Sequence, residues 1–188
     1  MTATTTPSAA GLAWAQRLVR FNTVSRESNL PLIECIADHL RTLGVPLRLS
    51  HDDSRRKANL FATLGEGKPG GVILSGHTDT VPWDGQAWTV DPLGADLRTV
   101  DGETRLYGRG SADMKGFIGL VVAQTQAFLD ADLPHALHYA FSYDEEVGCF
   151  GAQTLLADLA ESGLPKAALP RLCIVGEPTS MVPAIAHK

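Results

Sequence analysis

Cysteine is scarce in this sequence, and so are long apolar runs. The three cysteines, Cys35, Cys149 and Cys173, are an odd number and form no CxxC pair. The sequence therefore predicts neither a disulfide framework nor a thiolate zinc site, and we expect Cys173, inside the apolar run LCIV, to be a small core residue. No run approaches the roughly 18 apolar residues that cross a bilayer, and the N-terminus lacks the basic and apolar regions of a signal peptide. We expect a cytoplasmic protein with no membrane partner.

Positive charge is scarce as well. The chain has 16 Lys and Arg against 21 Asp and Glu, a formal net charge of -5, whereas a nucleic-acid surface needs a basic patch. The run Arg55-Arg56-Lys57 is short and follows two aspartates, which favours a solvated loop, so we expect no nucleic-acid partner. With 188 residues, 44% of them hydrophobic, the chain suits one globular domain with a sizeable core.

The hydrophobic pattern predicts strands that alternate with helices. Ser8 is placed to cap one helix and Pro31 to open another, and further helices are predicted at 115–132 and 151–162. Strand signals are found at 47–50, 59–65, 71–76, 137–143 and 171–176, and the run at 71–76 is apolar on both faces, which is typical of a strand inside a sheet covered on both sides. The order indicates an α/β fold with a mostly parallel or mixed sheet and helices on both faces.

Two other segments have a distinctive composition. The span 79–110 is rich in Gly, Pro and Asp, and we expect an ordered loop with short strands, one of them at 105–108. In the predicted helix 115–132, the small residues Gly116, Gly119 and Ala123 are expected to allow close packing on the sheet.

Acidic and imidazole side chains follow the predicted strands or occupy glycine-rich turns beside them. Ligands gather at the carboxyl ends of strands in such sheets, and carboxylates that meet there repel one another unless a cation lies among them. Nitrogen and oxygen ligands without thiolates suit zinc, with cobalt or manganese as alternatives. The residues are His77, Asp79, Asp113, Glu145, Glu146 and Glu177.

Their number favours two ions over one. Paired hydrolytic ions lie about 3.5–4 Å apart and share a bridging carboxylate, and Asp113, in a loop bracketed by glycines, is the natural bridge. His77 and Glu177 are then expected on one ion and Glu146 on the other, with Asp79 accepting the second ring N–H of His77. Because adjacent side chains point in different directions, one glutamate of the doublet is expected to coordinate while the other acts as general base.

Four motifs in order, SGHTDTVP, GRGSADMKG, DEEVG and GEPTS, resemble the dinuclear-zinc amidohydrolase and peptidase family over about Leu12 to Lys188. The resemblance implies a zinc-peptidase-like catalytic domain that acts on a small N-acyl amino acid, with Glu145 as the general base. It also implies a cis peptide bond after Asp113, which is costly for a non-proline residue, and homodimeric full-length relatives.

Within this family, FNTVS, SADMKGF and GEPTSMVPAIAHK look most like the acetylornithine deacetylase branch. The alternatives are a succinyl-diaminopimelate desuccinylase or dipeptidase on the same scaffold, and a metal-binding fragment without turnover. Family members are longer, so residues 1–188 are expected to be the N-terminal part of the catalytic domain, without the lid or dimerisation domain and the C-terminal part. A further histidine ligand is expected in that absent part, since His187 matches no motif.

Overall fold

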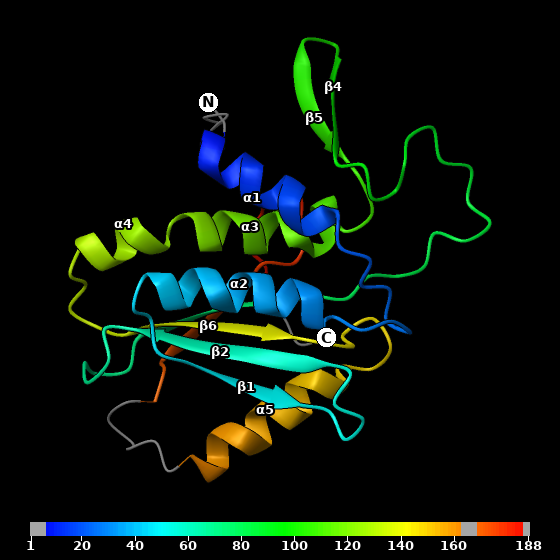
Figure 1. Cartoon of the computed structure of the whole chain (residues 1–188). Coiled ribbons are helices and arrows are strands. Elements are labelled where there is room, and N and C mark those ends of the chain that lie inside the picture. Colours follow the sequence, from blue (N-terminus) through cyan, green and yellow to red (C-terminus); the bar gives the residue numbers. More distant parts are fainter. Residues whose placement is uncertain (1–6, 163–168, 186–188) are drawn as a thin grey trace.

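A five-stranded sheet forms the centre of the computed structural model (Figure 1), which describes residues 7–162 and 169–185. Its strand order is β1 (Leu47–His51), β2 (Ala58–Leu64), β6 (Leu137–Ser142), β3 (Val72–His77) and β7 (Leu172–Val175). Strand β3 is parallel to β6 and β7, whereas β2 is antiparallel to β1 and β6. The predicted α/β fold is confirmed and the sheet is mixed. Strands β1 and β2 pair antiparallel because residues 52–57 between them are too few for a parallel crossover.

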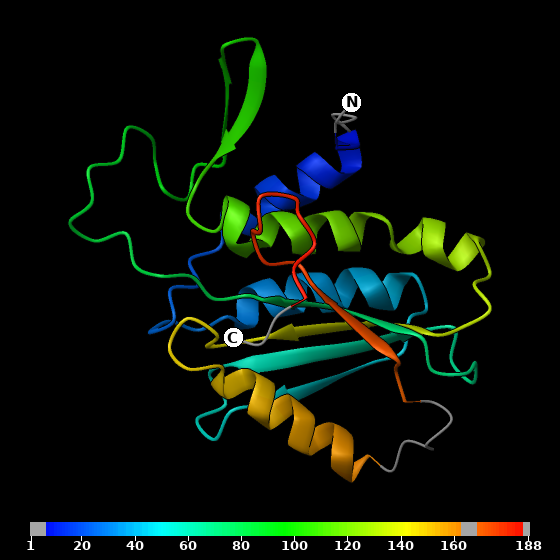
Figure 2. The ribbon, with the colours of Figure 1, turned by 180° about the vertical axis from the view of Figure 1, so that it is seen from behind.

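Helices cover both faces of the sheet, as predicted. Figures 1 and 2 show one face under α2 (Leu30–Thr42), α3 (Gly116–Ala123) and α4 (Thr125–Asp130), with α1 (Ala9–Val19) above them, and the other face under α5 (Phe150–Glu161). Helix α2 starts with proline in its first turn and buries apolar residues at three- and four-residue spacing, which is the pattern of a helix with one core face. The larger core cluster lies on this side and includes Leu32, Ile36, Leu60, Ile118 and Tyr139.

The segment predicted as one helix at 115–132 is divided into two helices, α3 and α4. A short irregular turn (Ser111–Lys115) precedes α3, and Gln124 separates α3 from α4. Gly119 does not pack on the sheet as expected: a Cβ atom there would lie 2.6 Å from the backbone nitrogen of Ala15 in α1. The small residue therefore allows two helices to approach closely, a tertiary contact that helix periodicity does not specify.

The glycine-rich span 79–110 is a long loop that ends in a hairpin. Its strands, β4 (Asp96–Val100) and β5 (Glu103–Tyr107), form a separate two-stranded sheet that projects from the body in Figure 1. Asp101 and Gly102 both have positive φ, as the tight Asp-Gly hairpin turn requires. The predicted strand near 105–108 is thus confirmed. Among the described residues, no helix is long and apolar enough to span a membrane.

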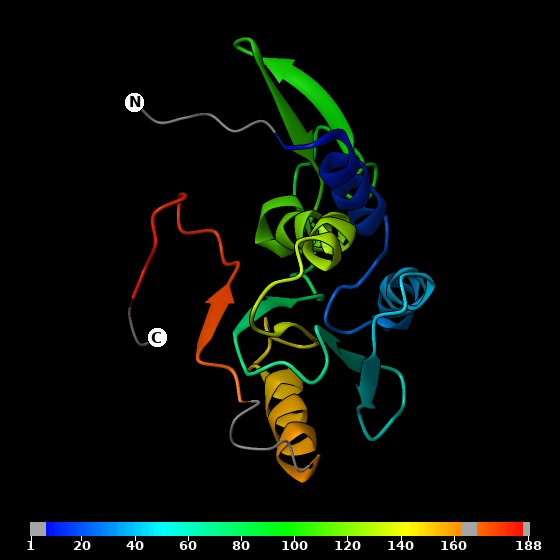
Figure 3. The ribbon, with the colours of Figure 1, turned by 90° about the vertical axis from the view of Figure 1, so that its left-hand side faces the viewer.

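Strand β7 lies at the outer edge of the sheet (Figure 3). All four of its residues are exposed, including Cys173, so the expectation that Cys173 belongs to the core is wrong. An apolar run predicts a strand, but burial depends on what covers that strand. The sheet order places β7 beside β3 alone, and within the described part of the chain its faces stay open.

Candidate metal centre

His77 is the last residue of β3 and is buried where that strand ends between β6 and β7. Its backbone N–H contacts the sulfur of Met114 at 3.2 Å. The ring Nδ1 lies 3.0 Å from the backbone oxygen of Asp79 and 3.5 Å from a carboxylate oxygen of the same residue. A carbonyl oxygen only accepts, so Nδ1 is the donor, and Nε2 is directed at the other acidic residues. Asp79 thus orients the ring mainly through its backbone oxygen, with its carboxylate slightly farther away.

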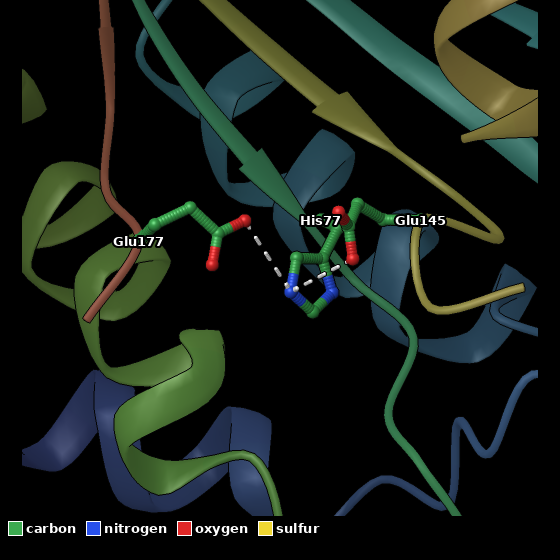
Figure 4. A group of neighbouring side chains, drawn as sticks. All are labelled: His77, Glu145 and Glu177. Carbon is green, nitrogen blue, oxygen red and sulfur yellow. Dashed lines mark ion pairs between the residues drawn. The ribbon is translucent and has the colours of Figure 1, made fainter. Parts of the chain in front are cut away.

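Three carboxylates from separate segments surround Nε2 of His77. The nearest is Asp113, whose Oδ1 is 2.9 Å away. Glu177, which follows β7, and Glu145, which follows β6, lie 3.8 and 3.9 Å away on either side of the ring (Figure 4). The carboxyl ends of neighbouring parallel strands therefore bring these side chains together, as expected for this class of sheet.

The ligand atoms form two overlapping groups, each with all its atoms within 4.8 Å of one another. One group contains His77, Glu145 and Glu177, and the other contains His77, Asp113 and Glu146. An imidazole with several carboxylates and no thiolate is a donor set that suits zinc, cobalt or manganese. The residues present therefore fit divalent ions, and all five predicted ligand and base positions lie in these groups.

The electrostatics of the site also favour a cation. Burial lowers the pKa of His77, but hydrogen bonds to the carboxylates of Asp79 and Asp113, with attraction to other acidic groups, raise that pKa overall to about 9. Burial raises the pKa of Glu146; His77 lowers it, while repulsion from Asp113, Asp79 and Glu145 raises it further. Negative charge is thus crowded around one imidazole, and a bound cation would offset the repulsion.

The carboxylate of Asp79 holds the turn that carries the glutamate doublet. Its oxygens accept hydrogen bonds from the Ser25 hydroxyl at 2.7 Å and from the backbone N–H groups of Glu145 and Glu146 at 3.0 and 3.3 Å. Burial by itself raises the pKa of Asp79, but its hydrogen bonds to His77, Ser25 and Glu145 lower that pKa overall. Asp79 therefore remains charged while buried and connects the histidine to the glutamate turn.

The loop around Asp113 is irregular. Gly110 has a φ of 78°, and Asp113 interrupts the helical turn with φ of -123° and ψ of 93°. The peptide bond from Asp113 to Met114 is cis, as the resemblance led us to expect. The Asp113 side chain is 47% exposed and its Oδ1 lies 2.9 Å from Nε2 of His77, so it faces both the histidine and solvent.

Lys115, next in this loop, was not singled out by the sequence. It is fully buried, and its Nζ donates a hydrogen bond to the backbone oxygen of Phe21 at 2.7 Å. Burial lowers the pKa of Lys115 to about 7, although the nearby Asp79 charge opposes this effect. A lysine beside an aspartate in a glycine-rich loop is usually a solvated residue, and only the tertiary structure identifies this one as buried.

The sequence also gives a wrong impression of Lys57. We expected it in a solvated loop with Arg55 and Arg56, yet its side chain is only 16% exposed and forms an ion pair with Asp144. The two residues lie 87 positions apart, so no local pattern connects them. The available signal was that Lys57 lies two positions before the run NLFATLG, next to the start of a buried strand.

Comparison with known proteins identifies the class. The family model described as peptidase family M20/M25/M40 matches residues 73–187, more than half of the chain. The chain belongs to this family. Among curated relatives, it is 40% identical over 163 residues to the acetylornithine deacetylase of Proteus mirabilis, covering 86% of this chain and 39% of that protein. It is 38% identical over 167 residues to the acetylornithine deacetylase of Pasteurella multocida, and this match covers 86% of this chain and 40% of that protein.

The chain thus spans about two fifths of the length of these relatives. Solved structures show the same fold: human carnosine dipeptidase 1 has a TM-score of 0.70 at 23% identity over 88% of this chain and 37% of its own. The M20 family metallo-carboxypeptidase Sso-CP2 from Sulfolobus solfataricus has a TM-score of 0.71 at 17% identity over 90% and 37%. The predicted family and catalytic-domain fold are confirmed. His187, which matches no ligand motif, lies outside the described residues.

Proposed function

We propose that this chain is part of the catalytic domain of a zinc-dependent amide hydrolase, one that converts N2-acetyl-L-ornithine to ornithine and acetate for arginine biosynthesis. The observation that carries the proposal is the convergence of Asp113, Glu145 and Glu177 on Nε2 of the buried His77. A family whose solved relatives include metallo-carboxypeptidases supports the metal. The acetylornithine deacetylases at about 40% identity support the substrate.

For the metal, we assign two zinc ions, with cobalt as an alternative. His77 and Glu177 would hold one ion and Glu146 the other, with Asp113 between them. This division is supported by the two ligand groups, because Asp113 and Glu146 belong to one group and Glu177 belongs to the other, while His77 belongs to both. Because Glu145 lies as near to His77 as Glu177 does, its separate role as general base rests on the family resemblance.

For the reaction, the chain supplies a base and its orientation. Zinc held by these residues would lower the pKa of a water molecule to about 7 and polarise the acyl carbonyl. The Glu145 carboxylate takes a proton from the attacking water and later gives it to the departing amine nitrogen. The new bond joins the water oxygen to the acyl carbon, the amide C–N bond breaks, and acetate and ornithine are released. Asp79 keeps the imidazole of His77 and the backbone of the glutamate turn in place throughout.

The test compares Glu145→Gln with Glu146→Gln in the full-length polypeptide. Metal content by mass spectrometry and acetylornithine hydrolysis are measured on the same samples. Glu145→Gln should keep its metal and lose about 10²- to 10⁴-fold in kcat, the usual contribution of a general base. Glu146→Gln should lose metal as well as turnover. Retained turnover in Glu145→Gln would show that the base has been assigned to the wrong residue.

A dipeptidase is the second candidate, favoured by the structural likeness to carnosine dipeptidase 1, and the desuccinylase is a variant of the same chemistry. Hydrolysis rates for acetylornithine, succinyl-diaminopimelate and a dipeptide by one sample distinguish the three. The third candidate, a metal-binding fragment, is favoured by the single histidine that both described ligand groups share. Bound zinc with no hydrolysis of any of these substrates would establish it.

A further inference from the structure

An ion pair outside both ligand groups anchors the turn that carries Glu145 and Glu146. Nζ of Lys57 lies 2.6 Å from each carboxylate oxygen of Asp144. The two side chains are only 16% and 14% exposed. The same Nζ donates a hydrogen bond to the backbone oxygen of Ser25. A charged pair this well shielded is screened less by solvent than an ordinary surface pair.

The position of Asp144 makes this contact consequential. Asp144 directly precedes the glutamate doublet and has a φ of 53°, a left-handed backbone conformation that non-glycine residues seldom adopt. The direction in which the next two side chains leave the strand depends on this conformation. An ion pair on the Asp144 side chain therefore acts at the residue that sets the direction of the turn.

A second side chain near the start of β2, that of Asn59, contacts the other end of the turn that follows β6. Asn59 donates a hydrogen bond to the backbone oxygen of Gly151 at 2.9 Å and accepts one from the backbone N–H of Tyr143 at 3.2 Å. Lys57 and Asn59 are two positions apart, so they point to the same side of an extended chain. The beginning of β2 thus contacts both ends of the turn after β6.

Ser25 joins this anchor to the centre of the site. Its backbone oxygen accepts from Lys57, while its hydroxyl donates to the Asp79 carboxylate at 2.7 Å. Asp79 in turn accepts from the backbone N–H groups of Glu145 and Glu146. The turn is therefore held by two contacts. The Asp79 carboxylate binds the backbone of the turn, and Lys57 binds the side chain of Asp144.

We propose that Lys57 and Asp144 are positioning residues, which set the geometry of Glu145 and Glu146 for metal binding and proton transfer. This inference rests on the function proposed above, because it assigns those two glutamates to the metal centre. Neither residue contacts the substrate or the ions in this scheme. They act through the conformation of the turn, as outer partners of a metal site do when they orient its ligands.

The chain offers a matched control. Lys68 has partners of the same kind as Lys57, an aspartate and a backbone oxygen. Its Nζ lies 2.5 Å from Asp132 and 2.6 Å from the backbone oxygen of Leu133. That pair is more exposed, at 31% and 89%, and follows the end of β2 that is remote from His77, because Leu64 pairs with the first residue of β6. Replacing Lys68 therefore removes a similar pair without touching the glutamate turn.

The experiment compares Lys57→Met, Asp144→Asn, Lys57→Arg and Lys68→Met with the parent full-length polypeptide. Three quantities are measured: zinc affinity by calorimetry, hydrogen exchange of the backbone over 143–149 without added metal, and the urea unfolding midpoint. We expect Lys57→Met and Asp144→Asn to weaken zinc binding about 10- to 100-fold, the usual effect of losing an outer partner, and to speed exchange in the turn. Lys57→Arg, which keeps the charge, should recover most of the affinity, and Lys68→Met should match the parent.

The outcomes distinguish a failure of the positioning role from a failure of the proposed zinc-dependent function. Lower unfolding midpoints with unchanged zinc affinity and unchanged exchange at 143–149 would mean that the pair is only structural, and would overturn the proposal. If the parent protein binds no zinc but exchange still accelerates in Lys57→Met and Asp144→Asn and not in Lys68→Met, the proposed function fails while the anchoring of the turn is supported. If Lys57→Met does not fold, Asp144→Asn and the recovery in Lys57→Arg decide the question.

Discussion

Replacing Asp79 with asparagine tests the central connection of the site. The carboxylate accepts hydrogen bonds from the Ser25 hydroxyl and the backbone N–H groups of Glu145 and Glu146 and lies 3.5 Å from Nδ1 of His77, whereas an amide of the same shape keeps only one oxygen. In the less costly orientation that oxygen still accepts from Glu145, and the new NH₂ group donates to the Ser25 hydroxyl. The backbone N–H of Glu146, 3.3 Å from the replaced oxygen, then faces another donor. A buried donor left unpaired costs about 1–3 kcal/mol.

The loss of charge adds to this cost. Hydrogen bonds to a charged group are worth about 1.5–3 kcal/mol each, against about 0.5–1.5 kcal/mol for neutral pairs, so the remaining bonds weaken as well. We expect Asp79→Asn to lower the free energy of unfolding by about 2–4 kcal/mol in all, and zinc affinity by about 10- to 100-fold.

Urea unfolding followed by circular dichroism measures the first quantity, and calorimetric titration with zinc measures the second. Asp84→Asn is the control, because Asp84 pairs with Arg26 on the surface at 65% exposure, where a substitution changes stability by less than about 0.5 kcal/mol. An Asp79→Asn protein with parental unfolding and zinc affinity would refute the view that Asp79 holds the glutamate turn.

Two further predictions concern the scaffold. Gly119→Ala should destabilise the protein by up to about 2 kcal/mol in urea unfolding, because the contact with backbone atoms of Ala15 costs about 1–3 kcal/mol and the better helix propensity of alanine returns about 1 kcal/mol. A more stable variant would contradict the close α1–α3 contact. Burial lowers the pKa of His138 from its usual 6.5, so the unfolded chain binds the proton more readily, and stability should fall as pH drops below 6.5 and level off below the folded-state pKa. That acid-dependent loss should shrink in His138→Gln, and an unchanged pH profile would mean that His138 does not contribute to it.

Much of the scaffold follows from local patterns. Apolar runs predict the strands, three- and four-residue spacing predicts α1 and α2, and Asp101-Gly102 indicates the turn of the projecting hairpin. Each of these signals depends only on neighbouring residues. The long helix predicted at 115–132 is interrupted at Gln124, a break that the apolar pattern does not show, and its Gly119 contacts α1 instead of the sheet.

The sequence by itself determined the composition of the candidate site and its place in the fold. His77, Glu145 and Glu177 each follow an apolar run, and because parallel strands end at the same edge of a sheet, that order is enough to predict that they meet. Their residue types then limit the ions that they suit. This part was predictable because strand ends are a local property of the chain.

Only the tertiary structure decided how those side chains are held. The pairing of Lys57 with Asp144, the burial of Lys115 and the exposure of Cys173 all run against the local pattern. Each depends on which segment lies opposite after the strands have assembled, and that is set by strand order and register, not by the residues next in sequence. A lysine is typical of the solvated surface, but the side chain of Lys57 is only 16% exposed, because a carboxylate and a carbonyl from distant segments lie within reach of its ammonium group.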